Sequence, residues 1–146
     1  MPYRIHGFRN GRAYHVVNKG RDGRRIFNSE ADYEKFAKMV SVYSVGRVRV
    51  EAFALVWNHF HFLLRQREHG GVQEFMKVLQ MQYSRSFEKG SGLFKGCFWA
   101  EEIQNSTHYY RVLDYILRNP VKHKLGMLGL DGVSGSTALK DNGIDV

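Results

Sequence analysis

The sequence is poor in cysteine, in acidic residues and in long apolar runs. Cys97 is the only cysteine of the 146 residues, which excludes an internal disulfide and fits a reducing cytoplasm. No stretch approaches the roughly 18 apolar residues of a membrane span, and the basic segment Met1–Arg12 lacks the apolar centre of a secretory signal. We therefore expect a cytoplasmic protein of one domain, long enough to bury a core without a disulfide or a structural metal.

The shortage of acid leaves the chain strongly basic, with 22 Lys and Arg against 14 Asp and Glu and a net charge of +8. Most of this excess falls within residues 1–25, where Asp22 is the only acid. A basic cluster favours a polyanion such as nucleic acid, because binding releases the counterions of the polyanion. A solvated basic face is the alternative. The basic residues of the segment are Arg4, Arg9, Arg12, Lys19, Arg21, Arg24 and Arg25.

Hydrophobic periodicity predicts seven elements in the order β-α-β-β-α-β-α. We expect strands at residues 13–18, 47–55, 57–64 and 97–104, and helices at 29–46, at 72–89 and from 106 to about 119, before Pro120. The first six elements match an α+β, ferredoxin-like or RRM-like fold, a split β-α-β antiparallel sheet with two helices on one face. The extra C-terminal helix is free to lie near the other face. We expect residues 1–126 to form this domain and the Gly- and Ser-rich residues 127–146 to form a flexible tail.

Local patterns add detail to three of these elements. Ser29 is predicted to cap the first helix with Asp32 in the capping-box position, and Ser106 to cap the third. In the second strand, alternation predicts one face with valine and alanine and an opposite face with charged side chains. The first face is Val48, Val50, Ala52 and Ala54, and the second is Arg49 and Glu51.

The run His59-Phe60-His61 lies within the third predicted strand. Alternate side chains of a strand share a face, so both imidazoles project together while Phe60 enters the opposite layer. Two imidazoles placed in this way can share one metal ion. Two histidines exposed on a sheet by chance are the alternative, and the pattern alone leaves both open.

The third predicted helix carries Tyr115 and Asn119, four residues apart and therefore on one side of it. They flank an apolar stripe of Tyr109, Val112, Leu113 and Ile116. A tyrosine at such a border is more often half-buried packing than a nucleophile. Of the aromatic residues outside the predicted core, Tyr3, Phe8 and Trp99 could stack on bases, although simple packing is the commoner role.

Four segments in fixed order carry a family resemblance. They are Tyr14-His15-Val16-Val17-Asn18-Lys19-Gly20, Ile26-Phe27, Asn58-His59-Phe60-His61-Phe62-Leu63-Leu64 and Tyr115-Ile116-Leu117-Arg118-Asn119-Pro120-Val121. Together they resemble the single-tyrosine HUH transposases, and within that superfamily most closely the REP-associated tyrosine transposases. The resemblance covers roughly residues 12–126.

The resemblance implies a role for each matching residue. Tyr115 matches the nucleophile, His59 and His61 match the metal-binding pair, and Asn119 matches the position of a third polar ligand. The implied metal is Mg²⁺ or Mn²⁺, whereas ligand softness alone would leave zinc open. The implied partner is single-stranded DNA with a hairpin or palindromic element, in a prokaryotic cytoplasm where the protein is nucleoid-associated when bound to DNA. Arg111, Arg118 and Lys122 join the basic segment Arg4–Arg25 as candidate DNA contacts.

The sequence therefore predicts metal-dependent cleavage and strand transfer of single-stranded DNA through a covalent 5′-phosphotyrosine. Three alternatives stay open: a non-catalytic nucleic-acid-binding domain, an HUH endonuclease not engaged in transposition, and a hydrolase whose His-bound metal activates water. Whether the protein works as a monomer or as a homodimer also stays open.

Overall fold

The computed structural model describes residues 7–87, 92–118 and 124–126. A five-stranded antiparallel sheet runs through it in the order β4-β1-β3-β2-β5. The strands are β1 (Ala13–Lys19), β2 (Val48–Val56), β3 (His59–Gln66), β4 (Trp99–Glu102) and β5 (Lys124–Gly126). The order of the first four strands confirms the predicted ferredoxin-like sheet. The short β5, which was not predicted, pairs with the outer edge of β2.

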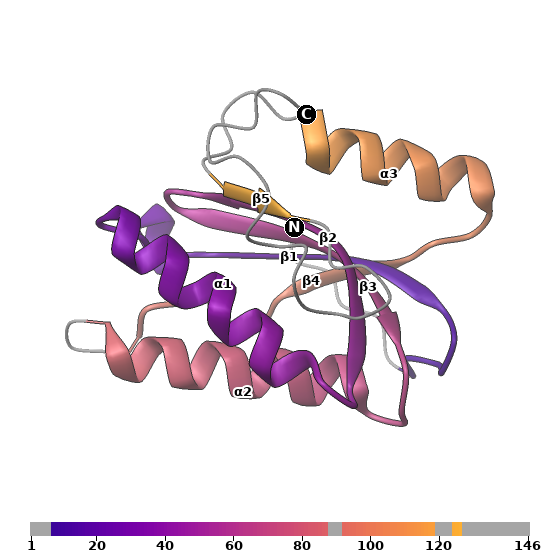
Figure 1. Cartoon of the computed structure of the whole chain (residues 1–146), viewed down its shortest axis with the longest axis horizontal. Coiled ribbons are helices and arrows are strands. Elements are labelled where there is room, and N and C mark those ends of the chain that lie inside the picture. The colour runs from indigo at the N-terminus through magenta and orange to yellow at the C-terminus, as the bar shows by residue number, and fades with distance from the viewer. Residues whose placement is uncertain (1–6, 88–91, 119–123, 127–146) are drawn as a thin grey trace.

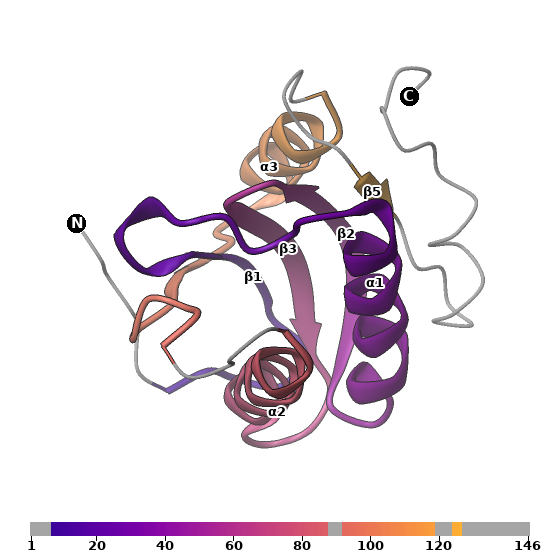
Figure 2. The same cartoon turned by 90° about the vertical axis from the view of Figure 1, so that its left-hand side faces the viewer.

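Three helices pack on the two faces of this sheet (Figures 1 and 2). α1 (Glu30–Ser44) and α2 (Gly71–Ser86) lie on one face, and α3 (Ser106–Arg118) lies on the other. The third helix therefore occupies the face left open by the first two, as predicted. No helix in the described part of the chain is long and apolar enough to cross a membrane.

The face covered by α1 and α2 holds the main core. Phe60 and Phe62 of β3 are fully buried there, against Phe36 of α1 and Phe75 of α2. Tyr83 of α2 is also buried, and its hydroxyl donates a 2.6 Å hydrogen bond to the Ile26 carbonyl. Apolar residues at helical spacing in both helices face this core; they are Tyr33, Phe36, Ala37 and Val40 of α1 and Val72, Phe75, Leu79 and Tyr83 of α2.

The ends of the helices confirm one predicted cap and correct another. At α1 the Asp32 N–H donates to Ser29 Oγ, while the Asp32 carboxylate accepts from the Asn28 N–H. At α3 the prediction of Ser106 as the cap was wrong, because the His108 N–H donates to the side chain of Asn105. The side-chain oxygen of an asparagine accepts from an unpaired N–H at the start of a helix as well as a serine hydroxyl does. The cap of α3 therefore lies one residue before Ser106.

A β-bulge in β2 overturns the predicted alternation of that strand. Val50 pairs with Leu64 and Ala52 pairs with Leu63, so Glu51 is an extra residue without an opposite partner. Val48 and Val50 belong to the main core, but Ala52 and Ala54 turn to the α3 face. The predicted single face of valine and alanine is therefore wrong beyond the bulge.

The α3 face holds a smaller cluster built from alanine and leucine. The bulge lets Ala52 and Ala54 contribute to it and leaves Glu51 on the same side. Val112 and Ile116 of α3 are the helix residues buried against it. Small side chains on the sheet allow the helix to approach closely over this half of the face.

Candidate active site under the third helix

His59 and His61 project from β3 toward the α3 face, as their spacing predicts. Their ring centroids lie 5.1 Å apart. His61 is buried, with 5% of its surface exposed, and His59 at the strand end is half-buried. The strand therefore presents two neighbouring imidazoles at the end of the sheet where β2 turns into β3.

A third imidazole, from His15 of β1, joins this pair. His15 is buried, and its Nε2 lies 3.2 Å from His61 Nδ1. Sequence reasoning missed this residue as a member of the site. The signal was present, because alternation places His15 on one face of the first strand, but the contact depends on β1 lying directly beside β3.

The environment keeps these imidazoles neutral at pH 7. Burial, reinforced by the neighbouring His15 and His59, lowers the pKa of His61 to about 3. Burial, together with His108, lowers the pKa of His15 to about 4, and burial with Lys19 also lowers the pKa of His59. A neutral imidazole keeps the lone pair that a metal ion requires.

The hydrogen bonds around the pair leave the same ring nitrogen available on both histidines. Asn58 Oδ1 lies 2.9 Å from His59 Nδ1, and a carbonyl oxygen accepts only from a protonated nitrogen. His61 Nδ1 is engaged with His15, and His61 Nε2 is buried without a hydrogen-bond partner among the described residues. A buried polar atom without a partner is costly, so this nitrogen suits a ligand such as a metal ion.

The two histidines do not make a complete metal site by themselves. The described residues contain no group of three or more His, Cys, Asp and Glu side chains suited to a metal ion. Asn119, the predicted third ligand, lies outside the described residues. His59 and His61 thus fit a metal ion that is bound by two imidazoles and completed by further oxygen ligands.

Tyr115 of α3 lies over these histidines. Its ring centroid is 5.4 Å from that of His61 and 6.2 Å from that of His15. The side chain is 53% exposed, so solvent or a bound strand can reach it. The phenol and the imidazoles, which come from elements far apart in the sequence, therefore share one site.

The aromatic residues proposed for base stacking differ in their placement. Phe8 is buried in the main core against Tyr14 and Phe98, so packing is its role. Trp99 of β4 is half-buried, with its ring centroid 5.2 Å from that of His15, at the border of the site. Tyr3 lies outside the described residues.

A buried carboxylate ties α3 to the sheet. The Tyr109 hydroxyl donates to Glu51 Oε1 at 2.5 Å, and Arg65 Nε donates to Glu51 Oε2 at 2.9 Å. Arg49 Nε lies 3.3 Å from Glu51 Oε2 as well, and together these partners offset the loss of water that burial imposes on Glu51. This contact was not predicted, because it depends on the bulge in β2. It fixes α3 six residues before Tyr115.

The predicted DNA-binding residues of the N-terminal segment divide between the two ends of the sheet. Arg9 and Arg12 both pair with Glu102, at the end marked by Ala13 and Arg65. Lys19 lies opposite His59 at the other end, about 20 Å away along the strand. Arg21, Arg24 and Arg25 follow Lys19 directly, and the Arg25 guanidinium lies 5.4 Å from the Trp57 ring centroid.

The remaining predicted contacts belong to α3 and its continuation. Arg111 and Arg118 are exposed on the helix, and Arg118 forms an ion pair with Asp114. Arg4 and Lys122 lie outside the described residues. The structure therefore brings Tyr115 and both histidines together, with Lys19 at the same end of the sheet, and holds Arg9 and Arg12 apart from them.

Comparisons with known proteins agree with this architecture. The family model described as "Transposase IS200 like" matches residues 9–116. No curated protein matches the chain. A solved structure of a REP-associated tyrosine transposase bound to a REP hairpin superposes with a TM-score of 0.71. It is 18% identical, and the match covers 83% of this chain and 73% of that one. With most of its length matched by that family model, the chain belongs to the IS200-like transposase family.

Proposed function

We propose that the protein cleaves and rejoins single-stranded DNA at a hairpin-bearing element, with Tyr115 as the covalent nucleophile. The observation that carries this proposal is the position of the exposed Tyr115 phenol, whose ring centroid lies 5.4 Å from that of the buried His61. The Nε2 of this imidazole has no partner within the described part of the chain. Family membership supports transposition as the overall reaction. The REP hairpin bound to the similar structure supports a hairpin as the partner.

In this proposal His59 and His61, with Asn119, would hold Mg²⁺ or Mn²⁺. Such an ion offsets phosphate charge and stabilises the additional charge of the transition state. The histidines fit that role because both are neutral and both keep Nε2 available. With its Nε2 on the metal, His61 would carry its proton on Nδ1 and donate to His15 Nε2, 3.2 Å away, so that His15 would hold the His61 ring in the required tautomer.

The phenol performs the covalent step. The Tyr115 oxygen forms a bond to phosphorus while the bond from phosphorus to the 3′ oxygen breaks. The phenolic proton passes to solvent, and the departing 3′ oxygen takes up a proton. An unperturbed tyrosine has a pKa of about 10, so nearby positive charge helps this proton loss. Arg111, one turn before Tyr115 on α3, is a candidate for that charge.

The covalent product explains why a tyrosine suits strand transfer better than water does. The aryl phosphate conserves the energy of the broken phosphodiester. A 3′-hydroxyl can therefore attack it, restore a phosphodiester and release the phenol without ATP. Positioning of the two strand ends supplies much of the rate of such a displacement.

The test is incubation with a hairpin-bearing oligonucleotide and Mn²⁺, followed by a denaturing gel and mass mapping of the modified residue. We expect a covalent protein–DNA adduct on Tyr115 that disappears in Tyr115→Phe. Tyr110→Phe is the matched control, because Tyr110 is an exposed tyrosine of the same helix. An adduct of normal yield in Tyr115→Phe would refute the assignment.

Three other outcomes point to the alternative functions. Cleaved DNA with free ends and no attached protein would indicate a hydrolase that activates water. Binding without cleavage, unchanged by replacing both histidines, would indicate a non-catalytic nucleic-acid-binding domain. Adduct formation without rejoining would indicate an endonuclease of the same superfamily.

A further inference from the structure

A cavity of about 440 Å³ lies beneath the start of α3, at the end of the sheet away from Tyr115. Its walls come from the start of β1, from β2 and β3, and from residues 103–106, where the chain passes from β4 into α3. Arg65, at this end of β3, lies four residues along the strand from His61, or about 13 Å away. Small-ligand sites usually have volumes of about 300–1,000 Å³. The cavity is therefore separate from the candidate active site and large enough for a ligand of its own.

Positive charge dominates the lining of this cavity. Three arginines line it, Arg12, Arg49 and Arg65, and the only acid among the described lining residues is Glu51. Arg49 and Arg65 lie directly opposite each other on β2 and β3. Like charges in such a pair destabilise a sheet, so the two arginines require negative charge beside them. Glu51 offers one carboxylate to two guanidinium groups, and Arg12 pairs with Glu102, so the lining keeps an excess of positive charge.

The two opposed arginines differ in how their nitrogens are satisfied. Arg65 donates from Nε and Nη2 to the Glu51 carboxylate and from Nη1 to the Gly11 carbonyl. Arg49 Nε lies 3.3 Å from Glu51 Oε2 but is buried without a hydrogen-bond partner among the described residues. A buried charged donor without such a partner costs free energy, which a bound anion would recover. Arg49 is therefore the lining residue best placed to bind an added anion.

Hydrogen bonds hold the walls of the cavity in fixed positions. The Ile103 N–H donates to the Ala13 carbonyl at 2.8 Å, which fixes the segment before α3 against β1. The Tyr109 hydroxyl donates to Glu51, which fixes the first turns of the helix against β2. A ligand would therefore enter a site that the fold has already formed.

The lining of the cavity also includes an exposed aromatic ring. Tyr110 lines it and is 64% exposed, so its ring is available for stacking by a nucleobase. Gln104 and Ser106 add polar side chains to the lining. The planar guanidinium group of an arginine suits the oxygens of a phosphate. An aromatic ring and an arginine in one cavity thus match the two parts of a nucleotide, its base and its phosphate.

We propose that this cavity binds a nucleotide, with the phosphate at Arg49 and the base stacked on Tyr110. A free nucleotide and a nucleotide within a DNA strand present the same two groups, and the experiment distinguishes them. The inference goes beyond the proposed function and does not depend on it, because the cavity shares no residue with the site of Tyr115 and the histidines.

The test is calorimetric titration of the full chain, in EDTA and at low salt, with dAMP, inorganic phosphate and deoxyadenosine. We expect dAMP to bind more tightly than either of its two parts. In Arg49→Gln, affinity for dAMP and for phosphate should fall about tenfold or more, the usual cost of one lost hydrogen bond to a charged group. In Tyr110→Ala, affinity for dAMP should fall about fivefold or more while phosphate affinity is unchanged. Tyr110→Phe keeps the ring and should bind dAMP as the native chain does.

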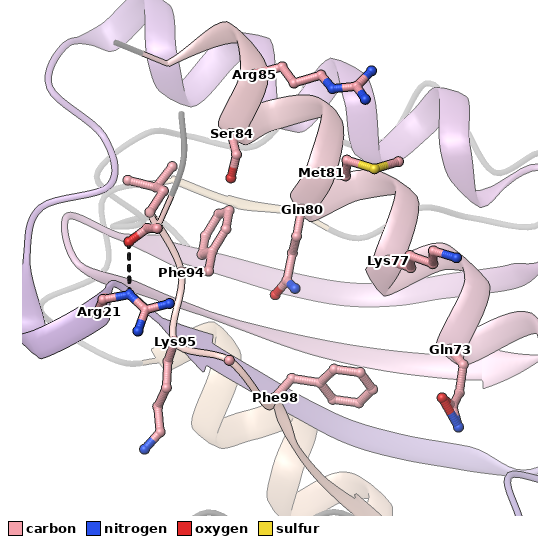
Figure 3. A pocket seen from close by; sticks show the side chains of 13 residues that line it. Arg21, Gln73, Lys77, Gln80, Met81, Ser84, Arg85, Phe94, Lys95 and Phe98 are labelled. Atoms are coloured by element: carbon pink, nitrogen blue, oxygen red, sulfur yellow. Dashed lines mark hydrogen bonds between the residues drawn. The ribbon is translucent and has the colours of Figure 1, made fainter. Parts of the chain in front are cut away.

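A larger basic cavity on the other face of the sheet supplies the matched control. It lies between α2 and residues 92–98, and Lys77 of α2 is one of the cations that line it (Figure 3). Lys77→Gln makes the same change of charge as Arg49→Gln and should leave dAMP affinity unchanged. Equal losses in these two variants would overturn the proposal, because binding would then depend on net charge alone.

Two further results would also overturn it. One is the absence of dAMP binding by the native chain, or native affinity in Arg49→Gln. The other is a loss of dAMP affinity in Trp99→Ala that Arg49→Gln does not show, which would place the nucleotide on the active-site side of β4, beside His15.

A single-stranded oligonucleotide without a hairpin distinguishes the two sources of the nucleotide. If it displaces dAMP and itself loses affinity in Arg49→Gln, the cavity holds a nucleotide of the strand. If dAMP binds equally well to the chain already saturated with the oligonucleotide, the cavity takes a free nucleotide.

Thermal unfolding supplies the check on folding. Bound dAMP should raise the thermal midpoint of the native chain more than that of Arg49→Gln. Arg49→Lys, which keeps the charge but not the planar group, is the second variant and should bind phosphate more tightly than Arg49→Gln does. Adduct formation on Tyr115 tests the proposed function separately, because dAMP binding in EDTA requires neither metal nor cleavage.

Discussion

The two faces of the sheet bury different kinds of side chain. The α1 and α2 face is filled by large aromatic and aliphatic groups, among them Phe36, Phe60, Phe62 and Tyr83. The α3 face holds a few alanine and leucine side chains, and beside them the polar residues His15, Glu51 and His61. One face therefore provides most of the apolar burial that stabilises the fold, and the other keeps room for reactive groups.

This difference has a consequence for α3. Only Val112 and Ile116 of that helix are buried, whereas Tyr109, Leu113 and Leu117 pack against the same cluster while partly exposed. The hydrogen bond from Tyr109 to Glu51 supplements these contacts. A helix held by few contacts can carry a nucleophile at its exposed border without weakening the main core. The comparison predicts that changes on the α3 face alter activity more than stability, and that changes on the other face do the opposite.

Among variants that keep Tyr115, the largest effect is expected from His61→Ala. Loss of one metal-binding imidazole should lower the rate of adduct formation about a hundred- to a thousandfold, the usual cost of removing one group that stabilises the charge of the transition state. The free energy of unfolding in urea should fall by no more than about 2 kcal/mol, because removal of His61 Nε2, which has no partner among the described residues, partly offsets the loss of the contact between His61 Nδ1 and His15 Nε2. His69→Ala, an exposed histidine, is the control. Normal adduct formation in His61→Ala would contradict the expectation that changes on the α3 face alter activity more than stability.

Metal binding gives this variant a second readout. Mn²⁺ in large excess should raise the thermal midpoint of the native chain, by the equivalent of about 2.7 kcal/mol at one hundred times its dissociation constant. The shift should vanish in His61→Ala and persist in His69→Ala. An equal shift in both variants would place the ion elsewhere.

The neighbouring residue on the same strand should behave in the opposite way. Phe60 is fully buried against Phe36 and Phe94. Phe60→Ala should lower the free energy of unfolding by about 3–5 kcal/mol, from lost burial and the cavity left behind. Below its unfolding transition the variant should still form the adduct, within about tenfold of the native rate. A loss of activity without a loss of stability would contradict the division between faces.

A smaller effect is expected from Tyr109→Phe. Removal of the hydroxyl leaves Glu51 with one fewer partner and should cost about 1–2 kcal/mol of unfolding free energy. Because this contact fixes α3, the adduct rate at saturating DNA should fall about tenfold while DNA affinity is unchanged. Tyr110→Phe, the adjacent exposed tyrosine, should alter neither quantity. A change in affinity alone would show that Tyr109 contacts DNA instead of positioning the helix.

The sequence predicted the α1 and α2 face more completely than the α3 face. Apolar residues at helical spacing marked both helices and their buried stripes, because that pattern depends on one element at a time. The shared face of His59 and His61 was predictable for the same reason, since strand alternation is local. The position of α3 could be predicted because α1 and α2 leave the other face of the sheet uncovered.

What could not be predicted depends on how strands pair. In the sequence of β2, apolar and charged residues alternate through Glu51 without interruption. Only the pairing of β2 with β3 reveals the bulge that turns Ala52 and Ala54 to the α3 face. His15 contacts His61 because β1 lies beside β3 in the sheet. A pattern within one strand cannot predict a contact between two strands. The separation of Arg9 and Arg12 from the active site follows from the length of β1 and from Glu102, a residue about ninety positions away.

The smallest effect concerns the surface of α3. Asp114 pairs with Arg118, a predicted DNA contact, and an exposed pair of this spacing contributes only about 0.3–0.5 kcal/mol to stability. Asp114→Asn removes a negative charge from the active-site face and releases Arg118. Affinity for single-stranded DNA should therefore rise about two- to threefold at low salt, with a steeper salt dependence. Glu34→Gln makes the same change of charge on the exposed side of α1, away from the active-site face, and should leave this affinity unaltered. If both variants raise the affinity equally, the DNA responds only to the net charge of the protein. A rise confined to Asp114→Asn means that the DNA lies along α3.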